Sequence, residues 1–467
     1  MQNDDWAFVR SVESYLQGDF SVNPIVLFNK SAPVFYLQGI IGALFSMIFS
    51  IESLPILTAF ISVGNFLMIY LILRKFFRKD PVESTLFGLL IIFNPIYFYS
   101  ILGFMTENYF MFFLLLSFYL ILSFSESEKP KDFILANLSI VLGFFIRQFS
   151  FVTSVSFSLY LFFRKKYKYA VYQGVISLII YGVYSLVLSG LSGLYDVGLN
   201  FSKLLRFEYE VSLITAIFIY LIIFLFPVFM FILKYKDLKL SLLLFGIFFF
   251  ILYTIFSPEK LYSAEFPYLG NTLGKTGFLT EDFRGIKGNF YGMFDFYRFL
   301  EIGAKVFVFL IPLSIIKVLR KEPNFFLIFF GVFLGLMMVS INVYDRYLTV
   351  VSISMLFILV GILDKLTVTK KVFLGLFIFV LSFLCYQFGF DFVYSRSAVW
   401  NMAKGIDNPK NVVAGVAWIK YYESESPKHF FSYNKSHKNY VLLETIEVNY
   451  PLDFFVNNNV YYFRYIP

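Results

Sequence analysis

The residues that could do chemistry here are a few charged side chains set among long apolar runs. Two adjacent carboxylates, Asp4 and Asp5, open the chain in "NDDWAFVRSVESYLQGD". A third, Glu107, lies in "GFMTENYF" between two apolar runs. Such a carboxylate can take a proton from an attacking hydroxyl or amine as a general base. No His or Cys is placed to do so, which directs attention to the carboxylates.

Three cations accompany these carboxylates. Lys30 lies in "FNKSAPVF", Arg147 in "FFIRQFSF" and Arg346 in "VYDRYL". Charges within membrane segments cost about 2.5–3.5 kcal/mol on insertion scales and indicate functional sites. A guanidinium or ammonium group can hold a departing phosphate through charge-assisted hydrogen bonds, which a partly dry site strengthens. Acids and cations on one membrane face would therefore suit a reaction in which a phosphate leaves.

Each charge also has a structural alternative. Asp4 or Asp5 can simply cap a helix, Glu107 can be a solvated turn residue, and Asp345 with Arg346 can form an interfacial ion pair. Arg147 is harder to explain in this way, because the runs that flank it are short for full spans and would place it in a recess.

The composition defines the setting of these residues. The chain has 467 residues, of which 59% are hydrophobic, 22% aromatic and 15% charged, with a mean hydropathy of +0.73. So much apolar surface predicts a polytopic membrane protein. The net charge of +8 comes largely from short basic loops, which argues against nucleic-acid binding. One cysteine, Cys385, and two histidines, His429 and His437, exclude a disulfide framework and a Cys- or His-rich metal centre.

The apolar runs predict an all-α membrane fold of about twelve spans. Basic clusters should mark cytoplasmic loops, and they lie at residues 74–80, 126–132, 164–168, 234–239, 317–322 and 364–371. They agree with one another only if the run at 33–51 does not cross the membrane. Asp4, Asp5, Lys30, Glu107, Arg147 and Arg346 then all lie on the extracytoplasmic side.

We divide the chain into three parts. Residues 1–54 form outer juxtamembrane helices with the acidic pair, and their first helix is amphipathic, with an apolar stripe of Phe8, Val12, Tyr15 and Leu16 and a stop at Gly18. Residues 55–392 form the multi-span membrane domain, with a large outer loop at 257–302. Residues 393–467 form a small extracytoplasmic α/β region. An outer helix at the very start also leads us to expect a preceding span that is missing from this chain.

In these motifs the sequence resembles the GT-C glycosyltransferases of the protein-O-mannosyltransferase and aminoarabinose-transferase type. The resemblance is best over about residues 1–165. The opening acidic pair followed by "YLQGDFSVNP" is similar to the first outer loop of that family, and "MTENYFMFFLL" to its second acidic motif. "FIRQFSFV" resembles the turn whose cation faces the carrier phosphate, and "YDRYL" the late "RYL" signature. "NKSAP" departs from the usual Lys-Pro or Pro-Pro.

The resemblance implies that a sugar moves in one inverting step from a polyprenyl-phosphate carrier to an acceptor glycan, lipid or protein. By this resemblance, Asp4 is the main catalytic carboxylate, Asp5 its acidic neighbour and Glu107 the second acid. Lys30, Arg147 and Arg346 are the cations near the donor phosphate. The expected location is a bacterial inner membrane with the site facing the periplasm.

Two other functions stay open. A transporter or flippase of lipid-linked glycans would show paired repeats and polar residues near mid-membrane, which the sequence lacks. An O-antigen polymerase or ligase would hold its key residues in one large loop, and the loop at 257–302 keeps this alternative open. No metal site and no certain cofactor is predicted, and the need for a divalent metal is left open.

Overall fold

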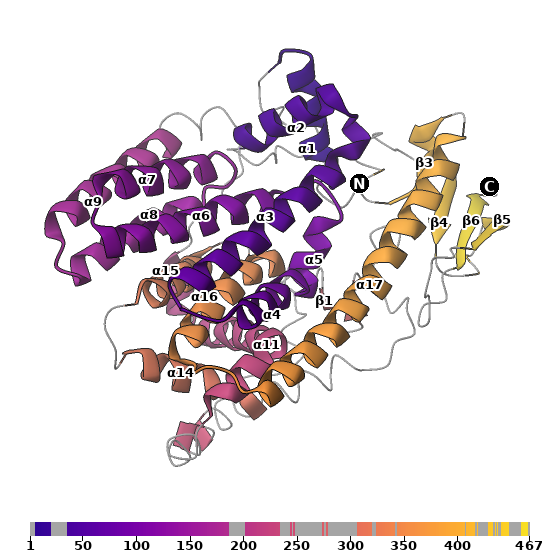
Figure 1. Ribbon diagram of the computed structural model, residues 1–467. Coiled ribbons are helices and arrows are strands. Elements are labelled where there is room, and N and C mark those ends of the chain that lie inside the picture. Colours follow the sequence, from indigo (N-terminus) through magenta and orange to yellow (C-terminus); the bar gives the residue numbers. More distant parts are fainter. Residues whose placement is uncertain are drawn as a thin grey trace.

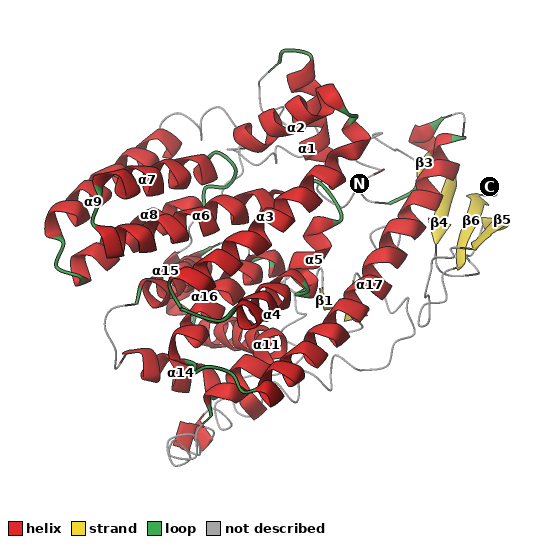
Figure 2. Ribbon diagram, in the orientation of Figure 1, coloured by secondary structure: helices red, strands yellow, loops and turns green. Residues whose placement is uncertain are grey.

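The computed structural model describes residues 5–19, 35–185, 201–233, 243–244, 246–247, 273–274, 277–278, 306–319, 324–340, 343–406, 408–415, 418, 428–432, 435, 437, 440–447 and 459–465. These residues form a mostly helical bundle with a small sheet beside its last helix (Figures 1 and 2). The predicted helical membrane fold with a small C-terminal α/β region is therefore confirmed in outline.

The first half of the chain supplies most of the described helices. They are α1 (Asp5–Leu16), α2 (Tyr36–Ile48), η1 (Ile51–Ser53), α3 (Leu54–Lys75), α4 (Pro81–Ile92), α5 (Pro95–Ile101), α6 (Thr106–Ser127), α7 (Pro130–Phe144), α8 (Ser150–Phe163) and α9 (Tyr167–Val183).

The chain after α9 adds η3 (Phe201–Leu205), α11 (Phe207–Ile232), the strand pair β1 (Leu273–Gly274) and β2 (Gly277–Phe278), α14 (Leu310–Leu319), α15 (Phe325–Val339), η6 (Asp345–Tyr347), α16 (Leu348–Ile362), α17 (Val368–Lys404) and η7 (Pro409–Asn411). The C-terminal strands are β3 (Val412–Val413), β4 (His429–Ser432), β5 (Tyr440–Glu447) and β6 (Asn459–Tyr465).

Among the described residues, 5 helices are long and apolar enough to cross a membrane, or 6 if α4 and α5 form one broken span. The predicted count of about twelve is not confirmed. Several apolar runs instead give short helices, such as α8 with 14 residues and α15 with 15. At 1.5 Å per residue these reach roughly 20 Å, less than the hydrocarbon thickness of about 30 Å. The predicted run at 240–256 lies almost entirely outside the described residues.

The break between α4 and α5 has a local cause. The two helices meet at 74°, and Pro95 cannot donate a backbone hydrogen bond to continue α4. Asn94 caps the new helix instead, since its side chain accepts a hydrogen bond from the Ile96 N–H at 3.1 Å. This bend brings α5 against α3 and α6, where the polar residues described below meet.

The amphipathic N-terminal helix is confirmed as α1. Phe8, Val12 and Tyr15 are buried, whereas Leu16 is 37% exposed, and the helix packs on α2. Gly18 has a φ of +81°, the left-handed conformation that ends helices, so the predicted stop is also confirmed. The 13-residue α2 is too short for a full span, in agreement with the predicted non-crossing run.

The basic clusters gather at one end of the bundle, which we call the basic end. Lys371 Nζ lies 2.5 Å from Asp80 Oδ2, and Lys166 Nζ lies 3.0 Å from Glu128 Oε1. Lys75, in the first of these clusters, donates to Ser123 Oγ at 3.0 Å. These contacts join segments that are far apart in the sequence, as expected if their loops lie on the same membrane face. The cluster at 234–239 lies outside the described residues.

The opposite end of the bundle is fixed by α3 and α6, which run antiparallel. Lys75 contacts Ser123 at the basic end, whereas Thr58 Oγ1 lies 3.2 Å from Tyr109 OH near the start of α6. The beginning of α6 is therefore at the end away from the basic clusters. We call it the site end.

Aromatic packing holds the middle of the bundle together. The Phe118 ring on α6 is fully buried and makes edge-to-face contacts with three phenylalanines of α15, Phe325, Phe326 and Phe329. Such pairs stabilise a core by about 0.5–1.5 kcal/mol beyond the apolar area that they bury. Much of the high aromatic content therefore serves helix packing.

The longest helix joins the bundle to the C-terminal sheet. Helix α17 has 37 residues and is about 55 Å long, well beyond the bilayer core. It continues without interruption through residue 393, and its end reaches the strands (Figure 1). There Val399 and Ala403 pack with Trp418 and Phe431. The sheet order is β3-β4-β6-β5, with β3 parallel to β4 and the other pairs antiparallel.

Candidate active site

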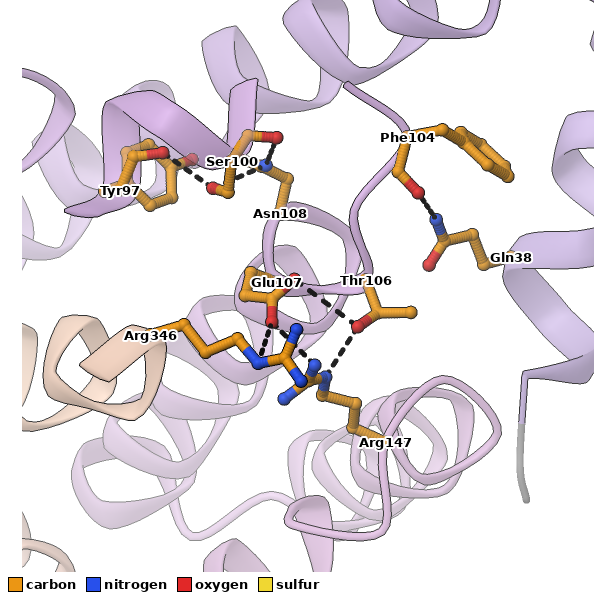
Figure 3. Close-up of polar contacts among 9 residues, drawn as sticks. All are labelled: Gln38, Tyr97, Ser100, Phe104, Thr106, Glu107, Asn108, Arg147 and Arg346. Atoms are coloured by element: carbon orange, nitrogen blue, oxygen red, sulfur yellow. Dashed lines mark hydrogen bonds and ion pairs between the residues drawn. The ribbon is translucent and has the colours of Figure 1, made fainter. Parts of the chain in front are cut away.

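Three of the predicted site residues meet at the site end of the bundle. Glu107 comes from the first turn of α6, Arg147 from the turn between α7 and α8, and Arg346 from η6 (Figure 3). Arg147 Nη2 donates to Glu107 Oε1 at 2.6 Å, and Arg346 Nε lies 3.2 Å from the same oxygen. The second contact is an ion pair without the alignment of a hydrogen bond. The topological prediction that these charges converge is thus reproduced in three dimensions.

Local sequence explains how Arg147 reaches this position. Its backbone N–H donates to Gly143 O at 2.9 Å, and its own carbonyl accepts from the Ser150 N–H at 3.1 Å. The turn is anchored from α2, where Leu37 N–H donates to Phe145 O at 3.0 Å. Short helices on both sides therefore lower the guanidinium into the bundle, as the lengths of the flanking apolar runs predict.

Thr106 is a further partner that sequence reasoning missed. Arg147 Nε donates to Thr106 Oγ1 at 2.6 Å, and the Thr106 hydroxyl donates to Glu107 Oε2 at 3.5 Å. Two bonds from one guanidinium thus fix its orientation against the start of α6. A hydroxyl residue directly before the acid in "MTENYF" was the available signal.

Part of the Arg147 guanidinium stays open. Nε and Nη2 are engaged, but Nη1 has no hydrogen-bond partner among the described residues. The side chain is 11% exposed and Glu107 is 7% exposed. The ring of Tyr347 lies 5.8 Å from the guanidinium carbon. An almost buried guanidinium with free donors is suited to bind an oxyanion such as a phosphate.

Arg346 is held in a more open place. Its side chain is 19% exposed, and its guanidinium carbon lies 4.5 Å from the centre of the Tyr344 ring. The neighbouring Asp345 is 2% exposed and has contacts of its own. The two guanidiniums share Glu107, which offsets their mutual repulsion and holds both beside the start of α6.

A polar network behind Glu107 fixes the beginning of α6. The side chain of Asn108 accepts from Ser62 Oγ at 2.9 Å and donates to Ser100 O at 2.8 Å. Asn65 of α3 donates to Asn108 O at 2.9 Å and to Tyr97 OH at 2.6 Å. Because these groups are buried and bonded to one another, they hold α3, α5 and α6 in one arrangement. Nothing in the apolar runs identified these partners in advance.

The other predicted site residues are Asp4, Asp5 and Lys30. Asp4 and Lys30 lie outside the described residues. Asp5 is the first residue of α1, and its side chain is not described. Among the residues that are described, no group of three or more His, Cys, Asp or Glu side chains could hold a metal ion.

Comparison with known proteins adds one family. A family model described as dolichyl-phosphate-mannose-protein mannosyltransferase matches residues 30–191. This range includes Glu107 and Arg147 and ends before Arg346. No curated protein and no solved structure matches the chain.

The match makes residues 30–191 similar to a family of mannosyltransferases, and the apolar helices indicate a multi-pass membrane protein. The predicted resemblance to the protein-O-mannosyltransferase family is confirmed over the matched range. Its finer form, an aminoarabinose-transferase type, is not confirmed.

Proposed function

We propose that the protein transfers a sugar from a polyprenyl-phosphate carrier to an acceptor glycan, lipid or protein at the extracytoplasmic face of a bacterial inner membrane. The observation that carries this proposal is the half-engaged guanidinium of Arg147. Its Nη2 donates to Glu107 Oε1 and its Nε to Thr106 Oγ1, while Nη1 can still donate to a phosphate oxygen. The matched family uses phosphate-linked sugars by its description.

The difference between the two ends of the bundle supports the proposed sidedness. Basic clusters meet at one end, and the Glu107, Arg147 and Arg346 cluster lies at the other. Lys- and Arg-rich loops favour the cytoplasm, so the site end faces outward. A phosphate-bearing substrate on that side, where ATP is absent, is most simply a lipid-linked one.

In the proposed reaction the acceptor oxygen or nitrogen attacks the anomeric carbon as the carbon–oxygen bond to phosphate breaks. The phosphate leaves with the bonding electron pair, and Arg147, Arg346 and Lys30 stabilise its charge. The proton of the acceptor passes to Asp4, with Asp5 as its neighbour. A single displacement of this kind inverts the anomeric configuration.

The contacts of Glu107 support a positioning role in this scheme. The Oε1 atom of Glu107 contacts both guanidiniums, so this carboxylate is engaged in holding them. We therefore assign Glu107 to the orientation of Arg147 and Arg346, and the base to the opening acidic pair.

Binding of bare polyprenyl phosphate tests the proposal. Purified Arg147→Gln should bind this lipid about 30- to 4,000-fold more weakly than the unaltered protein, the equivalent of about 2–5 kcal/mol for one lost partner of a desolvated charge pair. Arg78→Gln, an exposed cation at the basic end, is the matched control and should bind normally. Equal binding by Arg147→Gln and the unaltered protein would refute the assignment.

A further inference from the structure

One buried carboxylate outside the cluster of Glu107, Arg147 and Arg346 accepts no hydrogen bond within the described residues. Glu210 lies near the start of α11 and is 6% exposed. Among the described residues, neither of its oxygens has a hydrogen-bond partner. Leaving a buried carboxylate unpaired costs more than the roughly 1–3 kcal/mol of a neutral polar group. Groups of this kind in native proteins commonly serve a bound ligand.

Contacts around Glu210 place it at the site end. Lys203 of η3 donates to Ser340 O at 2.8 Å, directly after α15, and the chain then leads to Arg346 in η6. Helix α11 packs along α16, which begins immediately after η6. The far end of α11 is at the basic end, because Lys317 donates to Ile232 O at 3.0 Å. Glu210 is therefore on the same face as Arg346.

The surroundings of Glu210 favour a neutral, hydroxyl-bearing ligand. Lys203 is close enough to interact with it: burial lowers the pKa of Lys203, whereas the Glu210 charge raises it. Lys203 already provides a cation near Glu210, so a cationic ligand is not favoured there. The two carboxylate oxygens of Glu210 can accept hydrogen bonds from hydroxyls.

We propose that Glu210 binds the sugar of the lipid-linked donor, by accepting hydrogen bonds from two neighbouring sugar hydroxyls through its two carboxylate oxygens. This inference rests on the proposed function, in which Arg147 and Arg346 hold the phosphate that the sugar is attached to. The hydrogen bonds from the sugar then offset the desolvation cost of the Glu210 carboxylate. This favours a ligand that carries several hydroxyls.

The test compares carriers with and without a sugar. The probes are bare polyprenyl phosphate and polyprenyl phosphates that carry mannose, glucose, galactose or N-acetylglucosamine. The unaltered protein should bind at least one sugar-bearing carrier more tightly than the bare one. Glu210→Gln should lose at least about tenfold of this difference, because hydrogen bonds to a charged acceptor are the stronger ones, while its affinity for the bare carrier stays unchanged.

Thermal unfolding separates a ligand-binding role from a structural one. Glu210→Gln should unfold at the same or a higher temperature, since it removes the desolvation cost of a carboxylate that accepts no hydrogen bond within the described residues, while Lys203 keeps its bonds to Tyr209 OH and Ser340 O. The matched control is Glu83→Gln, a fully buried carboxylate at the basic end whose Oε1 accepts from the Leu366 N–H at 2.7 Å. This control should unfold at a lower temperature and keep the sugar-dependent difference.

Three results would overturn the assignment of Glu210. They are a sugar-dependent difference that survives in Glu210→Gln, a clear drop in its unfolding temperature, and equal binding of every sugar-bearing carrier and the bare one by the unaltered protein. Failure of the proposed function would give a different result, because the binding of bare polyprenyl phosphate would then not depend on Arg147.

Discussion

Replacing Glu107 by glutamine should strongly destabilise the site end, because one carboxylate holds two guanidiniums. Glu107 is 7% exposed and Arg147 is 11% exposed, so their pair is largely desolvated. Breaking a buried pair costs about 3–5 kcal/mol. The glutamine oxygen can still accept from Arg147 and returns about 1 kcal/mol. Arg346, 19% exposed, adds little because water screens it. The expected loss is about 2–4 kcal/mol.

A double-mutant cycle isolates the interaction. The free energy of unfolding in detergent is measured for Glu107→Gln, Arg147→Gln and the double variant. Glu107→Gln leaves the Arg147 guanidinium without its carboxylate, and Arg147→Gln leaves Glu107 with the more exposed Arg346 alone. The double variant should therefore be no less stable than the worse single variant. The coupling energy should be about 2–3 kcal/mol. The control cycle uses Lys166 and Glu128, whose side chains lie 3.0 Å apart with Glu128 67% exposed, and it should give under about 1 kcal/mol.

Additive losses in the Glu107 and Arg147 cycle would refute the reasoning. They would mean that the two side chains stabilise the protein independently, and that the carboxylate does not hold the guanidinium in place.

Three further predictions concern the base, the sidedness and the basic end. Asp4→Asn should reduce sugar transfer at least about a hundredfold without weakening the binding of bare polyprenyl phosphate; full activity in this variant, with loss in Glu107→Gln, would move the base to Glu107. In intact cells an impermeant maleimide should label a cysteine at Glu52, which is 81% exposed, but label one at Lys129 only after lysis, and the buried Cys385 gives little background; the reverse pattern would invert the topology. Burial alone would raise the pKa of Asp80, but hydrogen bonds from Lys371 and the Glu83 N–H lower it below 3.8, so this carboxylate stabilises the fold above about pH 4 and the contribution disappears as the pH falls through its folded-state pKa. Unfolding temperatures of the unaltered protein and Asp80→Asn should therefore differ at neutral pH and converge in acid, and a constant difference would count against the contact.

The sequence predicted the convergence of Glu107, Arg147 and Arg346 because sidedness depends on composition. Basic loops assign each turn to a membrane face, and turns on the same face can meet. The identity of the partners needs packing as well. Thr106 can be identified as a partner of Arg147 only from the position of the turn before α8 relative to α6.

Two other features lay beyond the sequence for physical reasons. Asn65 and Asn108 belong to apolar runs. The sequence of each run shows that a polar residue is present, but it does not show which helix supplies its hydrogen-bond partners. The predicted number of spans is not confirmed. A run of apolar residues gives the length of a segment in sequence, whereas bends such as the one at Pro95 decide how far the helix extends.

The most direct test of the central claim is an experimental structure of the protein with polyprenyl phosphate bound. We predict that the phosphate lies at the site end, with one oxygen within about 2.7–2.9 Å of Arg147 Nη1, while Glu107 keeps its contact with Nη2. A phosphate bound at the basic end, or one at the site end that leaves both Arg147 and Arg346 without contact, would contradict the account.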